Sequence, residues 1–273
     1  MQNLIKLSDV RDTVQKLWPE QAAESWDRVG LTVGSNETPV KKILFAVDAV
    51  RDTVTEAINW GADLIFTHHP LMLRGIHTVA EDTYKGALIA DLIRNRCALL
   101  SAHTNADVPV GGVSDAIADA IGLVNTEPIE PGLDSKSGLG RIGYLKAEIT
   151  LEDLALRLTK ALPKTAVGAR VAGQKNKPVY KVALLGGSGD SLLTHPKVQS
   201  SDVYITSDLR HHPAQEALEQ ASLNGGPALI DVAHWASESL WLKDAARQLK
   251  EELPGVETRV SEINTDPWIF RVG

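Results

Sequence analysis

The stretch ADLIFTHHP, residues 62–70, contains a short apolar run that ends directly in two histidines. A run of this length, rich in β-branched and aromatic side chains, predicts a buried strand over residues 63–67. His68 and His69 then stand at its carboxyl end, the edge where α/β sheets present ligand-binding groups, and Pro70 turns the chain. An isolated histidine pair at a turn is more often exposed than functional, so other residues have to support a site here.

Strands and helices alternate around this stretch. Residues 43–47 (ILFAV) and 97–101 (CALLS) predict two further buried strands. Residues 52–60 predict a helix ended by Gly61, because glycine readily takes the left-handed conformation that follows a helix. Ser114 is predicted to cap another helix with its hydroxyl. This alternation predicts an α/β fold.

A later part of the sequence repeats the pattern. The matched runs are KILFAV (42–47) with KVALLG (181–186) and ADLIFT (62–67) with SDVYIT (201–206). Their spacing is the same (67 − 42 = 25 and 206 − 181 = 25), and a third apolar run in each part ends in His103 or His234. Chance similarity of two strand sequences is the alternative, and equal spacing argues against it. We therefore predict two similar α/β domains that arose by internal duplication.

Residues 125–140 are rich in proline, glycine, serine and acidic side chains and predict a linker. The strand predicted after it, residues 141–149, leads into Thr150 and Asp153, which are spaced as in a capping box at the start of a helix.

Composition excludes several classes of protein. A formal charge of -7 and a pI near 5.6 argue against general binding to nucleic acid or anionic membranes. The single cysteine, Cys97, lies in an apolar run and allows neither an intrachain disulfide nor a thiolate metal cage. The first twenty residues lack the apolar core of a signal peptide, and no stretch approaches the length of a membrane span. These features predict a cytoplasmic protein.

Two further clusters of potential ligands follow predicted strands. His103 and Asp107 lie ahead of a Gly-Gly turn, and the spacing of four between His234 and Glu238 places both on one face of a helix. Imidazole and carboxylate together suit zinc, manganese, iron or nickel rather than calcium. A single ion needs fewer ligands than these clusters supply, so a dinuclear centre bridged by a carboxylate fits better.

Other residues leave alternatives open. The glycine-rich run 186–190 could hold a phosphate with its backbone amides, but it lacks the ending of a P-loop, and a tight turn fits equally well. Asp208 and His212 either line the site from the second half or lie in a surface turn. Trp26 and Trp235 could stack on a purine, although packing in the core is the stronger expectation.

Six motifs resemble those of the Nif-three-like family of dinuclear metal-centre proteins, whose members are commonly called GTP cyclohydrolase 1 type 2. They are ESWDRVGLTVG (24–34), ADLIFTHHPLML (62–73), LSAHTNADVPVGGVSD (100–115), GGSGD (186–190), TSDLRHHPAQEAL (206–218) and DVAHWASE (231–238). The resemblance implies metals near the interface of two α/β domains and a ring-shaped homohexamer. It also implies, by position in the motifs, the metal ligands His68, His69, Asp107, His234 and a bridging Glu238. His103 is in a motif but is not a usual ligand, and we predict it to be a proton carrier or orienting partner.

Ligands near residues 68, 107 and 234 require the C-terminal segment to return to the N-terminal half. We therefore expect a discontinuous metal-binding domain, residues 1–132 and 225–273, and a second domain, residues 133–224, without the further inserted domain of many relatives. The expected function is that of a dinuclear divalent-metal protein that hydrolyses a nucleotide, with His103 as the catalytic proton carrier. The same site could cleave a phosphodiester, and the alternative from a different class is a metal-binding regulatory or scaffold protein without turnover.

Overall fold

The computed structural model describes residues 4–132 and 134–272, which form two compact units. The first unit contains the chain up to Ala106 together with Leu242–Thr265. The second unit contains Asp107–Trp241 and the residues from Asp266 onward. These divisions differ from the domain boundaries expected near residues 132 and 224, which stay a prediction. Residue 133, where the second domain was expected to begin, lies outside the described residues.

The first unit is built on a five-stranded sheet with the order β1-β4-β3-β2-β13. Strands β2, β3, β4 and β13 run parallel, and β1 pairs antiparallel with β4 at the edge. The strand bounds are β1 (Gly30–Val33), β2 (Lys42–Ala46), β3 (Leu64–Thr67), β4 (Ala98–Ser101) and β13 (Glu257–Val260). Three of these strands confirm the predicted buried runs. Because β13 pairs with β2, the C-terminal segment does return to the N-terminal sheet.

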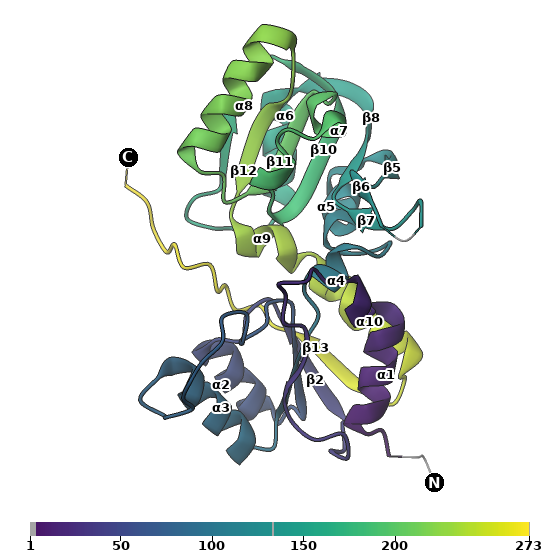
Figure 1. The fold of residues 1–273 in the computed structure, drawn as a ribbon, viewed down its shortest axis with the longest axis vertical. Helices are drawn as coiled ribbons and strands as arrows, with labels where there is room; N and C mark the ends of the chain where they lie inside the picture. Colours follow the sequence, from purple (N-terminus) through teal and green to yellow (C-terminus); the bar gives the residue numbers. More distant parts are fainter. Residues whose placement is uncertain (1–3, 133, 273) are drawn as a thin grey trace. The chain divides into compact units, whose positions relative to one another are not determined.

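Helices cover both faces of this sheet (Figure 1). Helices α2 (Arg51–Trp60) and α3 (Tyr84–Arg94) pack on the face that presents apolar side chains such as Leu44, Ile65 and Leu99. On the other face lie α1 (Leu7–Leu17) and α10 (Trp241–Glu252), and Trp18 at the end of α1 meets Phe66 with ring centroids 5.4 Å apart. Alternate residues of β3 therefore bury into two layers, as expected for a strand in a doubly covered sheet. A short helix η1 (Glu20–Ala22) follows α1.

The second unit contains a six-stranded sheet with the order β5-β8-β10-β11-β12-β9. Its central strands β10, β11 and β12 are parallel, and β8 and β9 pair antiparallel at either side of them. The bounds are β5 (Val124–Glu127), β8 (Arg141–Thr150), β9 (Ala169–Ala172), β10 (Pro178–Ser188), β11 (Val203–Ser207) and β12 (Ala228–Val232). The linker predicted over residues 125–140 is wrong in part, because it holds most of β5 and the short pair β6 (Glu130–Pro131) and β7 (Gly138–Leu139).

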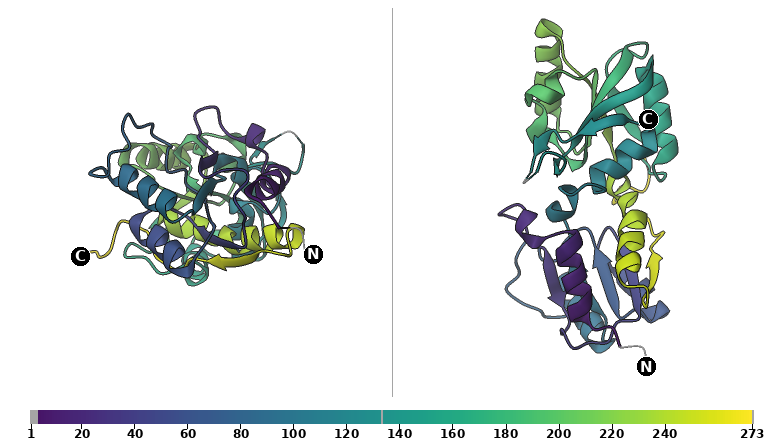
Figure 2. Two further views of the ribbon diagram at one scale, coloured as in Figure 1. Left: turned by 90° about the horizontal axis from the view of Figure 1, so that it is seen from below. Right: turned by 90° about the vertical axis from the view of Figure 1, so that its right-hand side faces the viewer.

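Two layers of helices also enclose the second sheet (Figure 2, right). Helices α5 (Val113–Ile121), α6 (Leu151–Ala161) and α9 (His234–Ser239) share one core, while α7 (Pro196–Gln199) and α8 (His211–Asn224) pack with η2 (Asp190–Leu192) on the opposite face. Thr150 caps α6 as predicted, since its hydroxyl accepts a hydrogen bond from the Asp153 amide at 3.1 Å. Ser114 does not cap α5, which begins after Gly112. Its hydroxyl instead accepts a hydrogen bond from Gly186.

The two units repeat specific interactions as well as strand order. Asp63 accepts hydrogen bonds from two amides at the start of β2, at 2.8 and 2.9 Å, and Asp202 does the same at the start of β10, at 2.9 and 2.7 Å. Gly34 and Gly173, which follow β1 and β9, both have positive φ, and a Cβ on either would meet the Cβ of the first alanine of the neighbouring strand at 2.8 Å. These matched details agree with the duplication expected from the sequence, which stays a prediction.

Among the described residues, no helix combines the length and the apolar character required to cross a membrane.

Arg141 generates a prediction about stability, because it is a buried cation that ties β8 to the start of α5. Its side chain is 2% exposed and makes a two-pronged ion pair with Asp115 at 2.6 and 2.7 Å. Replacing it with methionine leaves Asp115 without its counter-charge, so we expect Arg141→Met to lower the free energy of unfolding by about 3–5 kcal/mol. Urea unfolding measures this loss.

A matched control is Lys175→Met, which removes an ion pair between Lys175 and Glu152 that lies at the surface. We expect this variant to lose less than about 1 kcal/mol, because water screens exposed pairs. Equal losses for the two variants would contradict the structural role of Arg141.

Candidate metal centre

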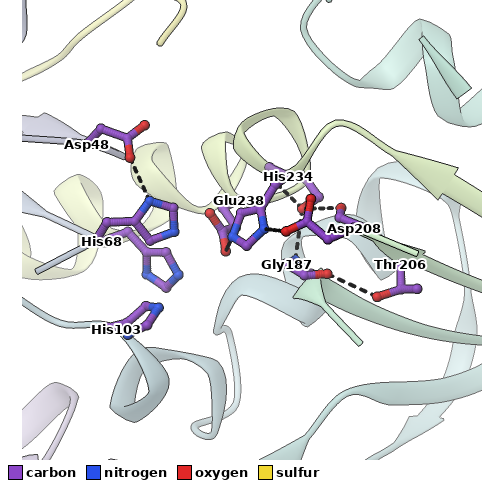
Figure 3. Close-up of polar contacts among 12 residues, drawn as sticks. Asp48, His68, His103, Gly187, Thr206, Asp208, His234 and Glu238 are labelled. Atoms are coloured by element: carbon purple, nitrogen blue, oxygen red, sulfur yellow. Dashed lines mark hydrogen bonds and ion pairs between the residues drawn. The ribbon is translucent and has the colours of Figure 1, made fainter. Parts of the chain in front are cut away.

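Three histidines gather at the carboxyl edge of the first sheet. His68 and His69 follow β3 directly, and His103 follows the neighbouring parallel strand β4. One ligand atom from each ring lies within 4.8 Å of those of the other two. His68 and His103 are labelled in Figure 3. His68 is fully buried, while the side chains of His69 and His103 are 25% and 12% exposed. Adjacent residues of one strand converge here because the strand ends at Thr67 and the chain turns before Pro70.

Each of these rings has its Nδ1 engaged by an oxygen. Asp48 binds the Nδ1 of His69 at 2.7 Å, Asp27 binds that of His103 at 2.9 Å, and the carbonyl of Ala102 accepts from His68 at 3.1 Å. A carbonyl or an ionised carboxylate can only accept, so the imidazole hydrogen must be on Nδ1. The lone pair of each neutral ring is then on Nε2, which is the arrangement common to metal-binding histidines in proteins.

The two aspartates that bind these rings, Asp48 and Asp27, accept further hydrogen bonds from other residues. The Thr265 hydroxyl donates to the second oxygen of Asp48. Asp27 accepts from the backbone and side chain of Thr104 at 3.1 and 2.5 Å and from the Arg28 amide at 2.7 Å. Burial alone raises the pKa of Asp27, but the hydrogen bonds from His103 and Thr104 outweigh it and hold that pKa well below its usual range. Asp27 is therefore a carboxylate at neutral pH.

In the second unit, a histidine and a glutamate lie on consecutive turns of one helix. His234 begins α9 immediately after β12, and Glu238 follows one turn later, so that Nε2 and Oε1 are 2.9 Å apart. Asp208, at the end of β11, binds the other ring nitrogen of His234 at 2.7 Å (Figure 3). His234 and Glu238 thus lie on one face of the helix, as their spacing of four predicted. The His234 ring is also held at Nδ1 by an oxygen, like the other three rings.

The charges around His234 define a site for a cation. Partial burial lowers the pKa of His234, but the nearby carboxylates of Glu238 and Asp208 outweigh it and raise the pKa to about 11. In the metal-free protein the imidazole of His234 is therefore protonated on both nitrogens, with Nδ1 facing Asp208 and Nε2 facing Glu238. A divalent cation bound at Nε2 would replace this proton and offset the same negative charge.

Gly187 explains the glycine-rich run. A Cβ at this position would lie 2.6 Å from Oε1 of Glu238, and its φ of +75° also disfavours other residues. The Gly187 amide donates to the Ser237 hydroxyl at 2.9 Å, and this hydrogen bond joins the end of β10 to α9. Residues 186–188 belong to β10, and the amides of Gly186 and Gly187 donate to Ser114 and Ser237. A tight turn therefore describes only the end of the run, where Gly189 leads into η2. The glycine instead lets Glu238 approach the strand.

The predicted site residues therefore fall into groups. His68, His69 and His103 come together in the first unit, and His234 and Glu238 come together in the second. Asp107 is buried at the end of α4 (Thr104–Asp107), at the division between the units. Of the open assignments, Asp208 holds the His234 ring, whereas His212 lies in α8 beside His211.

The two tryptophans behave differently from each other. Trp235 packs partly buried against the core of the second unit, as expected. Trp26 does not pack in the core: it is 54% exposed, and its ring meets that of His103 edge to face at 5.9 Å. An aromatic surface therefore lies open beside the histidines.

Two aspartates that hold histidines of the candidate site were not predicted from the sequence. Asp48 directly follows the predicted strand 43–47, at the same edge as the histidines, and that position was a usable signal. Asp27 lies in the ESWDRVGLTVG motif but far from any predicted strand end. Only the contact with His103 reveals its importance.

Comparison with known proteins gives a consistent picture. Residues 5–267 match the model of the Duf34/NIF3 family, NGG1p interacting factor 3. A Streptomyces coelicolor protein named GTP cyclohydrolase 1 type 2 homolog is 46% identical, over 98% of this chain and 95% of its own length. A Mycobacterium tuberculosis protein of the same name is 32% identical over 97% of both. The crystal structure of a Bacillus cereus protein related to NIF3 matches with a TM-score of 0.90 and 26% identity, over 98% of this chain and 100% of that one.

The raised pKa of His234 predicts that metal binding displaces a proton. Near neutral pH this ring is protonated in the metal-free protein, and it must lose that proton to become a ligand. We expect Zn²⁺ affinity to rise with pH below the pKa of about 11, by up to roughly tenfold per unit. Calorimetric titrations in buffers of different ionisation enthalpy count the released protons.

Asp208→Asn is the matched variant, because it removes one of the charges that raise the pKa of His234. It should release fewer protons than the wild type. Zn²⁺ binding with no proton release in either protein would show that His234 is not a ligand.

Proposed function

The chain belongs to the Duf34/NIF3 family, and from that premise we propose that it is a metal-dependent hydrolase that holds two divalent metal ions and acts on a nucleotide. The observation that carries this proposal is the set of imidazoles held at Nδ1 by oxygen atoms, three in the first unit and His234 beside Glu238 in the second. Rings held in this way are prepared to donate through Nε2.

The proposed ligands of the two ions are His68, His69, Asp107, His234 and Glu238, with Glu238 as the bridge. Nitrogen and carboxylate donors suit zinc, manganese, iron or nickel, and a mixed set of this kind selects poorly among them. The chemistry of the donors fits this assignment, because the carboxylates of Glu238 and Asp208 already hold a proton on His234 in place of a larger cation. Two bound ions would supply Lewis acidity, which lowers the pKa of water and offsets negative charge on the substrate.

The residues of the chain have distinct roles in the proposed reaction. His103 is the proton carrier: it takes a proton from the attacking water at Nε2 and returns it to the atom that leaves. Trp26 offers an exposed ring beside His103 on which a purine can stack. In the proposed reaction, water adds to C8 of the purine, a bond between C8 and a ring nitrogen breaks so that the imidazole ring opens, and that nitrogen is the leaving atom that takes the proton from His103. The names of the curated relatives and the position of Trp26 both favour a nucleotide over a simple phosphodiester.

We also propose that the protein assembles as a ring-shaped homohexamer, as the family resemblance implies. This assembly and the cytoplasmic location expected from sequence are parts of the same proposal.

The function has a direct test. Protein purified without chelator should contain close to two transition-metal ions per chain by elemental analysis, because the proposed donor set exceeds the needs of one ion. The loaded protein should then release product from GTP or another purine nucleotide, and more slowly from bis(p-nitrophenyl) phosphate.

The other outcomes separate the alternatives. Preferential cleavage of the phosphodiester would identify a phosphoesterase. Two ions without product from any substrate would identify a metal-binding scaffold, and one ion or none would overturn the dinuclear centre.

Substitutions test the proposed division between ligand and proton carrier. Glu238→Gln keeps the size of the side chain but removes the charge that offsets two cations, so their repulsion is less compensated. We expect loss of at least one ion and a fall in affinity beyond the roughly 10- to 100-fold that residues outside the ligand set produce. Elemental analysis and Zn²⁺ titration measure both.

The matched variant is His103→Gln, which should keep both ions and slow hydrolysis by about 100-fold or more. If Glu238→Gln binds two ions with unchanged affinity, Glu238 is not the bridge. If His103→Gln loses an ion, His103 is itself a ligand.

A further inference from the structure

Asp27 is a buried acid between two exposed neighbours. It lies in the loop that joins η1 to β1, where Trp26 and Arg28 face solvent while the Asp27 side chain is fully enclosed. Burial of an ionised carboxylate is costly unless hydrogen bonds compensate it. At Asp27 they do, since each of the two oxygens accepts two hydrogen bonds.

The two oxygens of Asp27 serve different purposes. Oδ2 accepts from the backbone amide and the hydroxyl of Thr104, the first residue of α4, and so stabilises the start of that helix. Oδ1 accepts from Nδ1 of His103 at 2.9 Å and from the Arg28 amide. If Asp27 only stabilised the start of α4, its hydrogen bonds from Thr104 would be sufficient. A hydrogen bond to an imidazole does not stabilise the start of a helix. The contact with His103 therefore requires its own explanation.

The same carboxylate-to-Nδ1 contact occurs at two other histidines. Asp48 holds His69 and Asp208 holds His234, in each case at 2.7 Å. In the Asp27 pair, His103 is directed toward its neighbours: its ring centroid lies 5.1 Å from that of His68 and 5.4 Å from that of His69. In this geometry the carboxylate of Asp27 determines which nitrogen of the His103 imidazole carries the hydrogen.

We propose that Asp27 is a positioning residue that fixes the hydrogen of His103 on Nδ1 and directs the lone pair of Nε2 toward His68 and His69. Asp27 acts through His103 and touches no reacting atom. The consequence for turnover rests on the proposed hydrolase function, because only a ring with a free lone pair on Nε2 can accept a proton there. The state of the ring itself does not depend on that function.

Asp27→Asn separates the two purposes of the acid. If the amide oxygen of the introduced asparagine takes the place of Oδ2, both Thr104 bonds survive, the Arg28 amide loses its acceptor, and the NH₂ group faces His103. An NH₂ group donates, so the ring must accept at Nδ1 and carry its hydrogen on Nε2. A histidine held in the wrong tautomer keeps its position but loses its use as a base, as is established for the serine protease triad.

The experiment reads the tautomer in metal-free protein. Long-range ¹H–¹⁵N spectra of ¹⁵N-histidine-labelled protein, in mildly alkaline buffer, distinguish a ring with hydrogen on Nδ1 from one with hydrogen on Nε2. The His103→Gln spectrum assigns the His103 signals among those of the 8 histidines. We expect hydrogen on Nδ1 in the wild type and on Nε2 in Asp27→Asn. Hydrogen on Nε2 in the wild type overturns the proposal without any variant.

Thr104→Val is the matched control, because it removes a hydrogen bond to Oδ2 and leaves the contact between Oδ1 and His103. It should lower stability but keep the wild-type tautomer. An unchanged tautomer in both Asp27→Asn and Asp27→Ala, which leaves Nδ1 without this acceptor in any orientation, refutes the positioning role, and so does a changed tautomer in Thr104→Val.

A second readout connects the tautomer to turnover. Loaded with Zn²⁺, Asp27→Asn should keep the wild-type number of ions and lose about 100-fold in kcat, with little change in KM. An unchanged kcat would show that the tautomer has no catalytic consequence. If the wild type shows the expected tautomer but no turnover, the hydrolase proposal fails while the positioning of His103 by Asp27 stands.

Discussion

Parallel pairing of neighbouring strands is the constraint on which the rest of the structure depends. In the first unit Thr67 and Ser101 are register partners in β3 and β4, and their hydroxyls meet at 2.8 Å. The residues that follow must therefore leave the sheet at the same edge. This places His68, His69 and His103 together although the last two lie far apart in the sequence. In the second unit, parallel β11 and β12 bring Asp208 to His234 in the same way.

Histidines placed together in this way need partners that keep them oriented. The imidazoles of His68, His69, His103 and His234 each have an oxygen at Nδ1, and for three of them that oxygen belongs to an aspartate. Ionised aspartates are costly to bury, and the hydrogen bonds to Asp27 offset that cost. All four rings are therefore held at Nδ1, and the second nitrogen of each ring is Nε2.

The protonation of His234 also depends on the carboxylates around it. Without metal, two carboxylates retain a proton on this ring up to about pH 11. A metal ion bound at Nε2 would compete with this proton, and occupancy of the proposed site would then depend on pH. Gly187 contributes by having no side chain, because any Cβ would displace Glu238 from its position. The proposed hydrolase therefore depends on a glycine and on several aspartates as much as on the ligands themselves.

The sequence by itself determined the α/β class, the buried strands around residues 43–47, 63–67 and 97–101, and the end of a helix at Gly61. Apolar runs and helix caps are local signals, so they survive without knowledge of the fold. The pairing of His234 with Glu238 was predictable for the same reason, since a spacing of four on a helix is a local geometric fact. The expected linker over residues 125–140 was misjudged because its short strands have polar, turn-like composition and are held by pairing with distant residues.

Only the tertiary structure decided how the histidines are held. Asp27 and His103 are separated by 76 positions, and neither local sequence indicates that the two residues are in contact. Trp26 was expected in the core because tryptophan is mostly apolar, yet its neighbour Asp27 takes the buried place in the loop and leaves the ring at the surface. The glycine of the GGSGD run was ambiguous until Glu238 proved to occupy the space of its missing side chain. Contacts of this kind depend on which elements the fold brings together, and a local pattern carries no record of that.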